Sequence, residues 1–231
     1  MKRQKTSAII SLTILYLLSF TGTASGQDTP NFRFGIFADP VISWFSSDTK
    51  VTSNEGARAG FNFGMTFNRY FSKNYSFSTG ISILNAGGRL HNTDTVTMHF
   101  NNFNTVVKPG ESVTYRMQYI DIPLGLKFES NQIGYITFFT DLGLDPKYLV
   151  GGKMDIPDES ISKETATKEL NRFNMSYHLM TGIEYSLGGT TAVVLGIGYE
   201  NNFIDATKDI GDQPVDRIRQ NIIRFRLGIN F

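Results

Sequence analysis

Apolar and polar side chains alternate without a break over the last seven residues of the chain. One set of alternate positions is apolar: Phe225, Leu227, Ile229 and Phe231. The other set is polar or small: Arg226, Gly228 and Asn230. Successive side chains of a β-strand point to opposite faces, so this pattern predicts a final strand with one apolar and one polar face.

The same period of two recurs upstream and predicts seven more strands. The clearest lies at 58–71, where phenylalanines and a methionine alternate with glycine, asparagine and threonine. Another contains Pro123, which cannot donate a hydrogen bond to a neighbouring strand. The eight predicted strands lie at about 32–45, 58–71, 75–84, 115–128, 135–144, 174–187, 190–203 and 219–231.

Short and long connections alternate between these strands. The short ones lie at 72–74, 129–134 and 188–189, and the long ones at 46–57, 85–114, 145–173 and 201–218. Outer-membrane barrels have an even number of strands, short periplasmic turns and longer extracellular loops. We therefore expect an all-β fold, an eight-stranded antiparallel transmembrane β-barrel with both termini on the periplasmic side. This fold predicts that the protein lies in the outer membrane of a Gram-negative cell.

A soluble eight-stranded barrel of the lipocalin type would show the same strand number and the same alternation. Its apolar face would point inward and fill the barrel. In this chain the second face is rich in glycine, serine and threonine and carries a few charges, which suits the interior of a membrane barrel better. The aromatic residue at the end of the last strand, Phe231, also favours the membrane barrel.

The beginning of the chain has the pattern of an export signal. Basic residues precede an apolar segment at 8–20, and the small residues Ala24, Ser25 and Gly26 follow it. We expect cleavage of residues 1–26 and a mature chain that starts at Gln27. An uncleaved anchor is the alternative. No linker or low-complexity segment interrupts 27–231, which predicts a single outer-membrane barrel domain.

Composition narrows the possible functions. The chain has no cysteine, which removes disulfides and thiolate metal sites. Its formal net charge is +1, so the charge gives no long-range attraction to nucleic acid, and we expect no nucleic-acid partner. Outside the export signal no apolar segment has the length of a membrane helix.

The predicted strands carry charged residues of both signs on their polar face. An eight-stranded barrel has room only for side chains in its interior, and an unpaired charge there would be costly. We expect a paired polar network in which Arg224 and Arg226 bridge Glu184, Glu200 or Asp141. A charged pathway for a small solute is the alternative. The predicted lumen residues are Asp121, Lys127, Asp141, Glu184, Glu200, Arg224 and Arg226.

Enzymatic and metal chemistry find little support in the sequence. Ser176 and His178 share a strand face, but Glu184 would lie about 20 Å from His178 at the ordinary rise of a strand. His91 and His99 fall in a long predicted loop without cysteine. The acidic residues at 155, 158 and 159 lack the spacing and glycine of a calcium loop, so we expect solvated loop surface there. We predict no catalytic residue, no metal and no cofactor.

The segment at 119–127, with the sequence YIDIPLGLK, resembles a strand common in the PorT-like small outer-membrane β-barrels of the Bacteroidetes. The export signal, the alternating connections and the terminal Phe231 are similar too. The resemblance implies a non-enzymatic accessory or structural component of an outer-membrane assembly such as type IX protein secretion. A small transport or ligand-binding barrel is the second hypothesis.

The expected partners follow from the predicted location and from this resemblance. They are outer-membrane lipid, the barrel-assembly machinery during insertion, and other outer-membrane or periplasmic secretion components. The long loop at 85–114 contains Met98, Phe100 and Phe103, which are candidates for an exposed surface that contacts such components.

Overall fold

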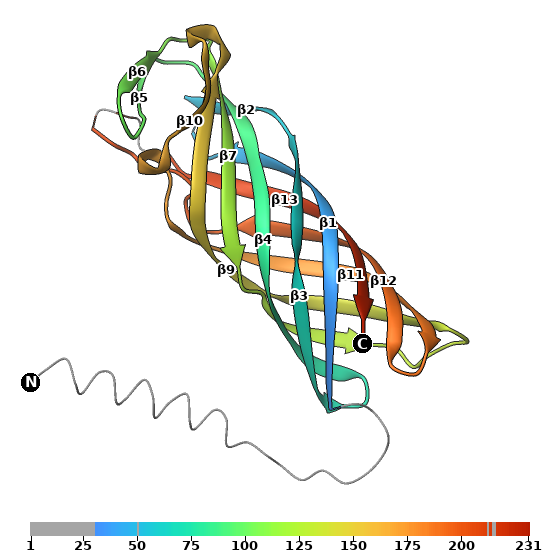
Figure 1. Cartoon of the computed structure of the whole chain (residues 1–231). Coiled ribbons are helices and arrows are strands. Elements are labelled where there is room, and N and C mark those ends of the chain that lie inside the picture. The colour runs from blue at the N-terminus through green and yellow to red at the C-terminus, as the bar shows by residue number, and fades with distance from the viewer. Residues whose placement is uncertain (1–30, 50, 212, 214–215) are drawn as a thin grey trace, which may run out of the picture.

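The computed structural model describes residues 31–49, 51–211, 213 and 216–231, and these form a closed β-barrel with the beginning of its first strand and the end of its last strand side by side (Figure 1). The predicted export signal and its cleavage site before Gln27 lie outside the described residues and stay predictions. The strands are β1 (Phe32–Ser47), β2 (Thr52–Gly56), β3 (Arg58–Ser72), β4 (Tyr75–Asn92), β5 (Val96–His99), β6 (Asn104–Val107), β7 (Ser112–Asp121), β8 (Leu124–Glu129), β9 (Ile136–Ile156), β10 (Ile161–Thr165), β11 (Phe173–Gly188), β12 (Thr191–Asn202) and β13 (Ile218–Asn230).

Eight antiparallel strand positions form the ring, as the alternation predicts. Two of these positions are each built from two consecutive strands: β2 and β3 both pair with β4, and β7 and β8 both pair with β4 and β9. The first and last strands close the ring, with Gly35 of β1 opposite Asn230 of β13. Two short 3-10 helices, Pro157–Glu159 and Thr167–Glu169, lie in the connection between β9 and β11.

The predicted single strand at 115–128 is wrong in one respect, because it is interrupted. β7 ends at Asp121 and β8 begins at Leu124, so Ile122 and Pro123 separate them. Pro123 has no N–H to donate to the ladder. The Ile122 N–H instead donates to the carbonyl oxygen of Pro146 at 3.1 Å.

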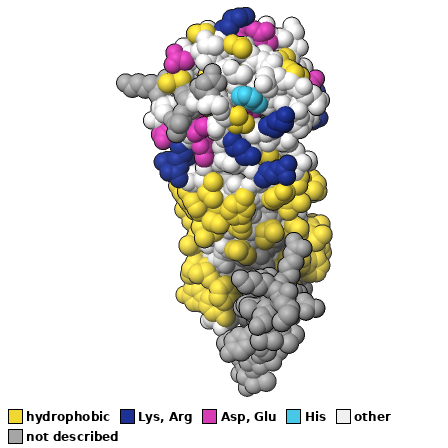
Figure 2. Space-filling model, turned by 90° about the vertical axis from the view of Figure 1, so that its left-hand side faces the viewer, with side chains coloured by type: hydrophobic (Ala, Val, Ile, Leu, Met, Phe, Trp, Pro, Cys, Tyr) yellow, Lys and Arg dark blue, Asp and Glu magenta, His cyan; other side chains and the backbone are white. Residues whose placement is uncertain are grey.

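The largest apolar side chains on the lower part of the barrel point outward, as a membrane barrel requires. Phe34, Phe63, Leu179 and Leu227 retain between 44% and 53% of their accessible surface. A lipocalin-type barrel would bury such residues, so that alternative is wrong. The predicted apolar face of the last strand is also outward and exposed: Phe225, Leu227, Ile229 and Phe231. Figure 2 shows the resulting apolar band below a polar upper part.

Several strands continue well beyond their predicted ends. β4 extends to Asn92 instead of residue 84, and β9 extends to Ile156 instead of residue 144. The predicted long loop at 46–57 likewise contains β2. The reason is a change of phase in the alternation, because apolar residues switch from the outward to the inward face partway along each strand. On β4, Ile83 points outward, whereas Leu84 and Leu90 are buried inside.

The change of phase occurs at the same level on neighbouring strands. Ile83, Ile120 and Tyr148 pair across β4, β7 and β9 and form the last outward apolar row. The next row, Leu84, Tyr119 and Leu149, is buried and points inward. Ile223 and Ile222 make the same change on β13. We call the part from the outward row toward the termini the membrane half, and the part from the inward row onward the outer half.

The outer half has a hydrophobic core of its own. Its strands and connections bury one contiguous set of apolar side chains, which includes Phe45, Leu90, Tyr115, Met154 and Ile218. Met98 and Phe100 belong to this core with 5% and 1% exposure, so the expectation that they form a contact surface is wrong. Phe103 is exposed and stacks on Phe100 with ring centroids 4.7 Å apart.

The expectation of solvated loop surface at Asp155 is also wrong. Asp155 lies on β9 and is 9% exposed, and it forms an ion pair with Arg116 of β7. His91 lies at the end of β4 and His99 on β5, so neither lies in an open loop. Within the described part of the chain, no helix is long and apolar enough to cross a membrane.

Candidate functional site: the charged lumen

The seven charged residues predicted for the lumen are contributed by β7, β8, β9, β11, β12 and β13. Their side chains point inward and are at most 18% exposed, because they alternate with the lipid-facing positions of the same strands. These residues are Asp121, Lys127, Asp141, Glu184, Glu200, Arg224 and Arg226. The structure brings them into four groups of ion pairs in the membrane half.

The innermost group centres on Arg224. Its guanidinium lies 3.0 Å from the carboxylate of Asp121 and also pairs with Glu200. Glu200 in turn pairs with Lys147 of β9, and both of these side chains are fully buried. A buried charge is tolerated in a medium of low dielectric constant only when it is paired and hydrogen-bonded. Each member of this group therefore depends on the others.

A second group lies near the periplasmic end. Lys127 pairs with Glu184 and lies 2.7 Å from Glu129. Glu184 also accepts a hydrogen bond from Arg33 of β1 at 2.9 Å. The hydroxyl of Tyr70 donates to the carboxylate of Glu129 at 2.8 Å. This group ties β1, β3, β8 and β11 together across the barrel.

Arg226 forms a separate pair, and its partner differs from the expected ones. Its Nε donates to both carboxylate oxygens of Asp39 at 2.9 and 3.0 Å. Its guanidinium carbon lies 3.8 Å from the ring centre of Phe37, so the cation also packs on an aromatic face. The expected bridge from Arg226 to Glu184, Glu200 or Asp141 is therefore replaced by a pair with β1.

Asp141 has a different partner, His178. The two ring nitrogens of His178 face two carboxylates, with Nδ1 at 2.8 Å from Asp145 and Nε2 at 3.5 Å from Asp141. Gly125 allows this approach, because a Cβ atom at that position would lie 2.5 Å from the Asp141 carboxylate. The Ser176 hydroxyl does not bond to His178 and instead donates to Glu200 at 2.8 Å.

Sequence reasoning missed several members of these groups. Asp145 and Lys147 lay beyond the predicted end of the fifth strand, although they continue the inward positions of Asp141 and Gly143. Asp39 and Arg33 lie on the inward positions of the first strand, where writing out the alternation would have found them. His178 was considered only as part of a catalytic arrangement. The alternation of inward and outward positions continues unbroken past residue 144, and following it would have predicted Asp145 and Lys147 as inward residues.

Little free space remains around the ion pairs. Two cavities between them have volumes of about 20 and 30 Å³, enough for single water molecules. Above Arg224, the inward row of Leu84, Tyr119 and Leu149 begins the apolar core of the outer half. A larger cavity of about 210 Å³ opens at the periplasmic end, and its lining includes Arg33, Tyr70, Glu129 and Glu184.

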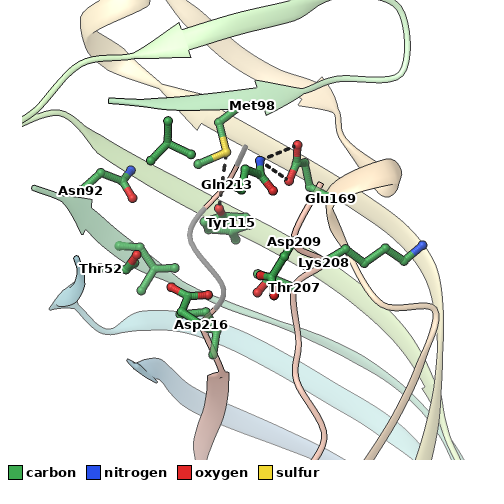
Figure 3. A pocket seen from close by; sticks show the side chains of 13 residues that line it. Thr52, Asn92, Met98, Tyr115, Glu169, Thr207, Lys208, Asp209, Gln213 and Asp216 are labelled. Carbon is green, nitrogen blue, oxygen red and sulfur yellow. Dashed lines mark hydrogen bonds between the residues drawn. The ribbon is translucent and has the colours of Figure 1, made fainter. Parts of the chain in front are cut away.

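The outer half contains a smaller pocket of about 40 Å³ (Figure 3). Gln213 donates there to both carboxylate oxygens of Glu169 at 3.1 and 3.0 Å. Asp216 and Asp209 also line the pocket. Burial is the main cause that raises the pKa of Asp216 to about 6; the hydrogen bond with Thr52 lowers this pKa, and the nearby carboxylates of Asp209, Asp205 and Asp48 raise it. Among the residues that the structure describes, no group of acidic or histidine side chains could hold a metal ion.

The fold and the two-sided strands define the class of the protein as an outer-membrane β-barrel. A family described as "Outer membrane protein beta-barrel domain" matches residues 19–208, and the chain belongs to this family. No curated protein sequence matches the chain.

Solved structures of small bacterial barrels resemble the chain. Neisserial surface protein A (NspA) is 11% identical with a TM-score of 0.48, and the match covers 87% of this chain and 96% of that one. OprG from Pseudomonas aeruginosa is 9% identical with a TM-score of 0.45, covering 86% and 95%. The outer membrane protease OmpT from Escherichia coli is 6% identical with a TM-score of 0.43, covering 90% and 98%.

Proposed function

We propose that this protein is a non-enzymatic component of an outer-membrane assembly, and that the assembly is one for protein secretion of the type IX kind. The proposal rests on the resemblance of residues 119–127 to PorT-like barrels and on the organisation of the barrel itself. In such a role the membrane half is an anchor and the outer half and the periplasmic turns are the surfaces that contact partners.

The observation that carries the proposal is the filled interior. The ion pairs around Arg224 and the apolar row of Leu84, Tyr119 and Leu149 occupy successive levels of the lumen. The cavities between the charged groups, of about 20 and 30 Å³, are large enough for single water molecules but too small for a solute. A barrel filled in this way contributes through its surfaces rather than through a pore.

The arrangement of Ser176 and His178 also favours a non-enzymatic role. The Ser176 hydroxyl is fully buried and donates a hydrogen bond to Glu200, so it is neither exposed to a substrate nor bonded to His178. His178 is held by two carboxylates on β9. We expect that replacing Ser176 by alanine changes the stability of the barrel and does not change any hydrolytic activity.

One observation favours the second function, a small transport or ligand-binding barrel. The cavity of about 210 Å³ at the periplasmic end is open, polar and lined by both signs of charge. It could take a small polar molecule from the periplasm. For transport, the ion pairs and the apolar row above it would have to move apart.

The two functions are distinguished by isolating the tagged protein from native outer membranes in mild detergent and identifying stoichiometric partners by mass spectrometry. Recovery with secretion components supports the accessory role. Isolation without a partner contradicts it. Single-channel currents in a planar bilayer would then support transport, and the variant Tyr119→Ala, which opens the apolar row, should increase them.

A further inference from the structure

Basic side chains gather on the outer surface immediately above the apolar band, as Figure 2 shows for one face of the molecule. We propose that the cluster on β3, β4, β7 and β9 binds the phosphate groups of an anionic lipid in the outer leaflet of the membrane. We call this cluster the basic row, and it consists of Arg58, Arg89, Arg116 and Lys153. The proposal requires only that the barrel lies in the outer membrane, and it is independent of the accessory role.

The pairing of the strands fixes the height of this cluster. Ile83, Ile120 and Tyr148 form the last outward apolar row. Asn85, Gln118 and Gly151 form the next outward row, which is uncharged, and a bulge on β9 exposes Val150 just below this row. Gly87, Arg116 and Lys153 form the row after that. The surface therefore changes from apolar to neutral to basic in three steps across the same three strands.

The distance between these rows matches the thickness of a lipid headgroup layer. Four residues along a strand rise about 13 Å, and a strand tilted by about 45° gains about 9 Å along the membrane normal. The headgroup region of a bilayer is about 5–8 Å thick on each side. Arginine and lysine side chains are long enough to reach back over such a difference. Arg116 and Lys153 therefore lie at the depth of lipid phosphates.

The cluster is poorly neutralised within the described residues. Asp155 is the carboxylate that pairs with it, through Arg116 at 2.5 Å. Arg89 donates to the hydroxyl of Thr114 at 3.3 Å, and Arg58 donates to the carbonyl oxygen of Ala86 at 3.4 Å. Burial lowers the pKa of Arg58, and the like charge of Arg116 lowers it further. Four cations that share one carboxylate favour an anionic ligand, and a phosphate can accept several N–H groups at once.

The choice of a lipid over a soluble anion follows from continuity with the membrane surface. The rows below the cluster are those that face the acyl chains, so one molecule can place its phosphates on Arg116 and Lys153 and its chains on Ile83, Ile120 and Tyr148. Basic residues next to a membrane surface contribute about five-fold each to the binding of anionic lipid.

The test compares the wild type with the double variant Arg89→Gln/Lys153→Gln, which breaks no ion pair among the described residues. The control is Lys73→Gln/Lys108→Gln, which removes the same charge from exposed positions outside the basic row, one in the periplasmic turn between β3 and β4 and one in the connection between β6 and β7, where Lys108 pairs with Glu159. Each protein in zwitterionic detergent is titrated with bis-phosphorylated lipid A, and binding is measured by native mass spectrometry. A change in gel mobility between unheated and heated samples verifies that each barrel is folded.

We expect about 25-fold weaker binding for the double variant and wild-type binding for the control. Lipid A without its phosphates should bind the wild type no more tightly than bis-phosphorylated lipid A binds the double variant. Equal binding of the wild type and the double variant overturns the proposal, and so does equal binding of stripped lipid A. If inorganic phosphate at about 10 mM competes fully with lipid A, the site binds free anions, and this outcome also overturns the proposal. If the double variant does not fold, Lys153→Gln alone should weaken binding about five-fold.

Discussion

The membrane half and the outer half of this barrel use the same strands with opposite faces. In the membrane half the apolar residues face lipid and the charged residues fill the interior. In the outer half the apolar residues fill the interior and polar residues such as Arg89 and Arg116 face outward. Each half thus buries the side chains that its own surroundings solvate poorly: charged ones in the membrane and apolar ones outside it. The comparison teaches that one ladder of hydrogen bonds can support two kinds of interior, provided that the alternation changes phase where the solvent changes.

The variant Arg224→Met should have the largest effect. It leaves Asp121 and Glu200 without their shared cation in a fully buried position, which costs about 3–5 kcal/mol. Urea unfolding of the barrel in detergent, followed by heat-modified gel mobility, measures this loss. Leu227→Ala, an outward change on the same strand, is the control. An unchanged unfolding midpoint for Arg224→Met would show that the pairs in the membrane half are dispensable.

The variant Leu84→Ala tests the apolar interior of the outer half. Leu84 is fully buried, and removing such a side chain typically costs about 2–5 kcal/mol. We expect faster amide hydrogen exchange in β7 and in the upper parts of β4 and β9, with little change in the lower part of β11. Hydrogen exchange by mass spectrometry resolves the two regions. Equal acceleration in both regions would mean that the halves unfold as one unit.

The variant Leu179→Arg tests the outer surface of the membrane half. Leu179 lies outward near the middle of β11 with 53% exposure, and an arginine at the middle of a bilayer costs about 2–4 kcal/mol in a barrel. The matched change in the outer half is Ser53→Arg on β2, an exposed position where we expect almost no effect. Unfolding in lipid vesicles compares the two. Similar losses in both variants would contradict the assignment of the two surfaces.

The smallest expected effect is the dependence of the stability of the outer half on pH. The folded-state pKa of Asp216 is raised from 3.8 to about 6, so the folded protein keeps a proton that the unfolded chain has lost. Stability from this group is therefore present at acid pH and is lost as the pH rises from about 4 to about 6. The effect is modest because solvent screens a half-exposed carboxyl group.

The variant Asp216→Asn isolates this effect. It should be more stable than the wild type at pH 7, and the difference should disappear below about pH 4, where both side chains are neutral. Hydrogen exchange in the outer half at several pH values measures it. A difference that stays constant with pH would assign the effect to packing around Thr52 instead of to charge.

The sequence predicted the ring, the outward apolar face and the seven inward charges, because each depends only on the parity of residues within a strand. The parity of a residue does not identify its ion-pair partner on another strand. The pair of Arg226 with Asp39 joins the last strand to the first, which are far apart in the chain, and the pair of His178 with Asp141 depends on the register between β11 and β9. The outer half was missed for a related reason. Beyond Ile83 and Tyr148 the alternation continues in the opposite phase, and a search for one constant apolar face ends there.

The step from Ile83 to Arg116 also makes the barrel sensitive to bilayer thickness. A thicker hydrocarbon layer would bring the row of Arg116 and Lys153 into the acyl chains, whereas a thinner one would leave Ile83, Ile120 and Tyr148 in the headgroups. Either mismatch costs a fraction of a kcal/mol per ångström of difference. Because the polar outer surface of the outer half lies directly above this step, sliding along the membrane normal cannot relieve the mismatch. The protein is therefore adapted to a narrow range of lipid chain lengths and would concentrate in membrane regions that match it.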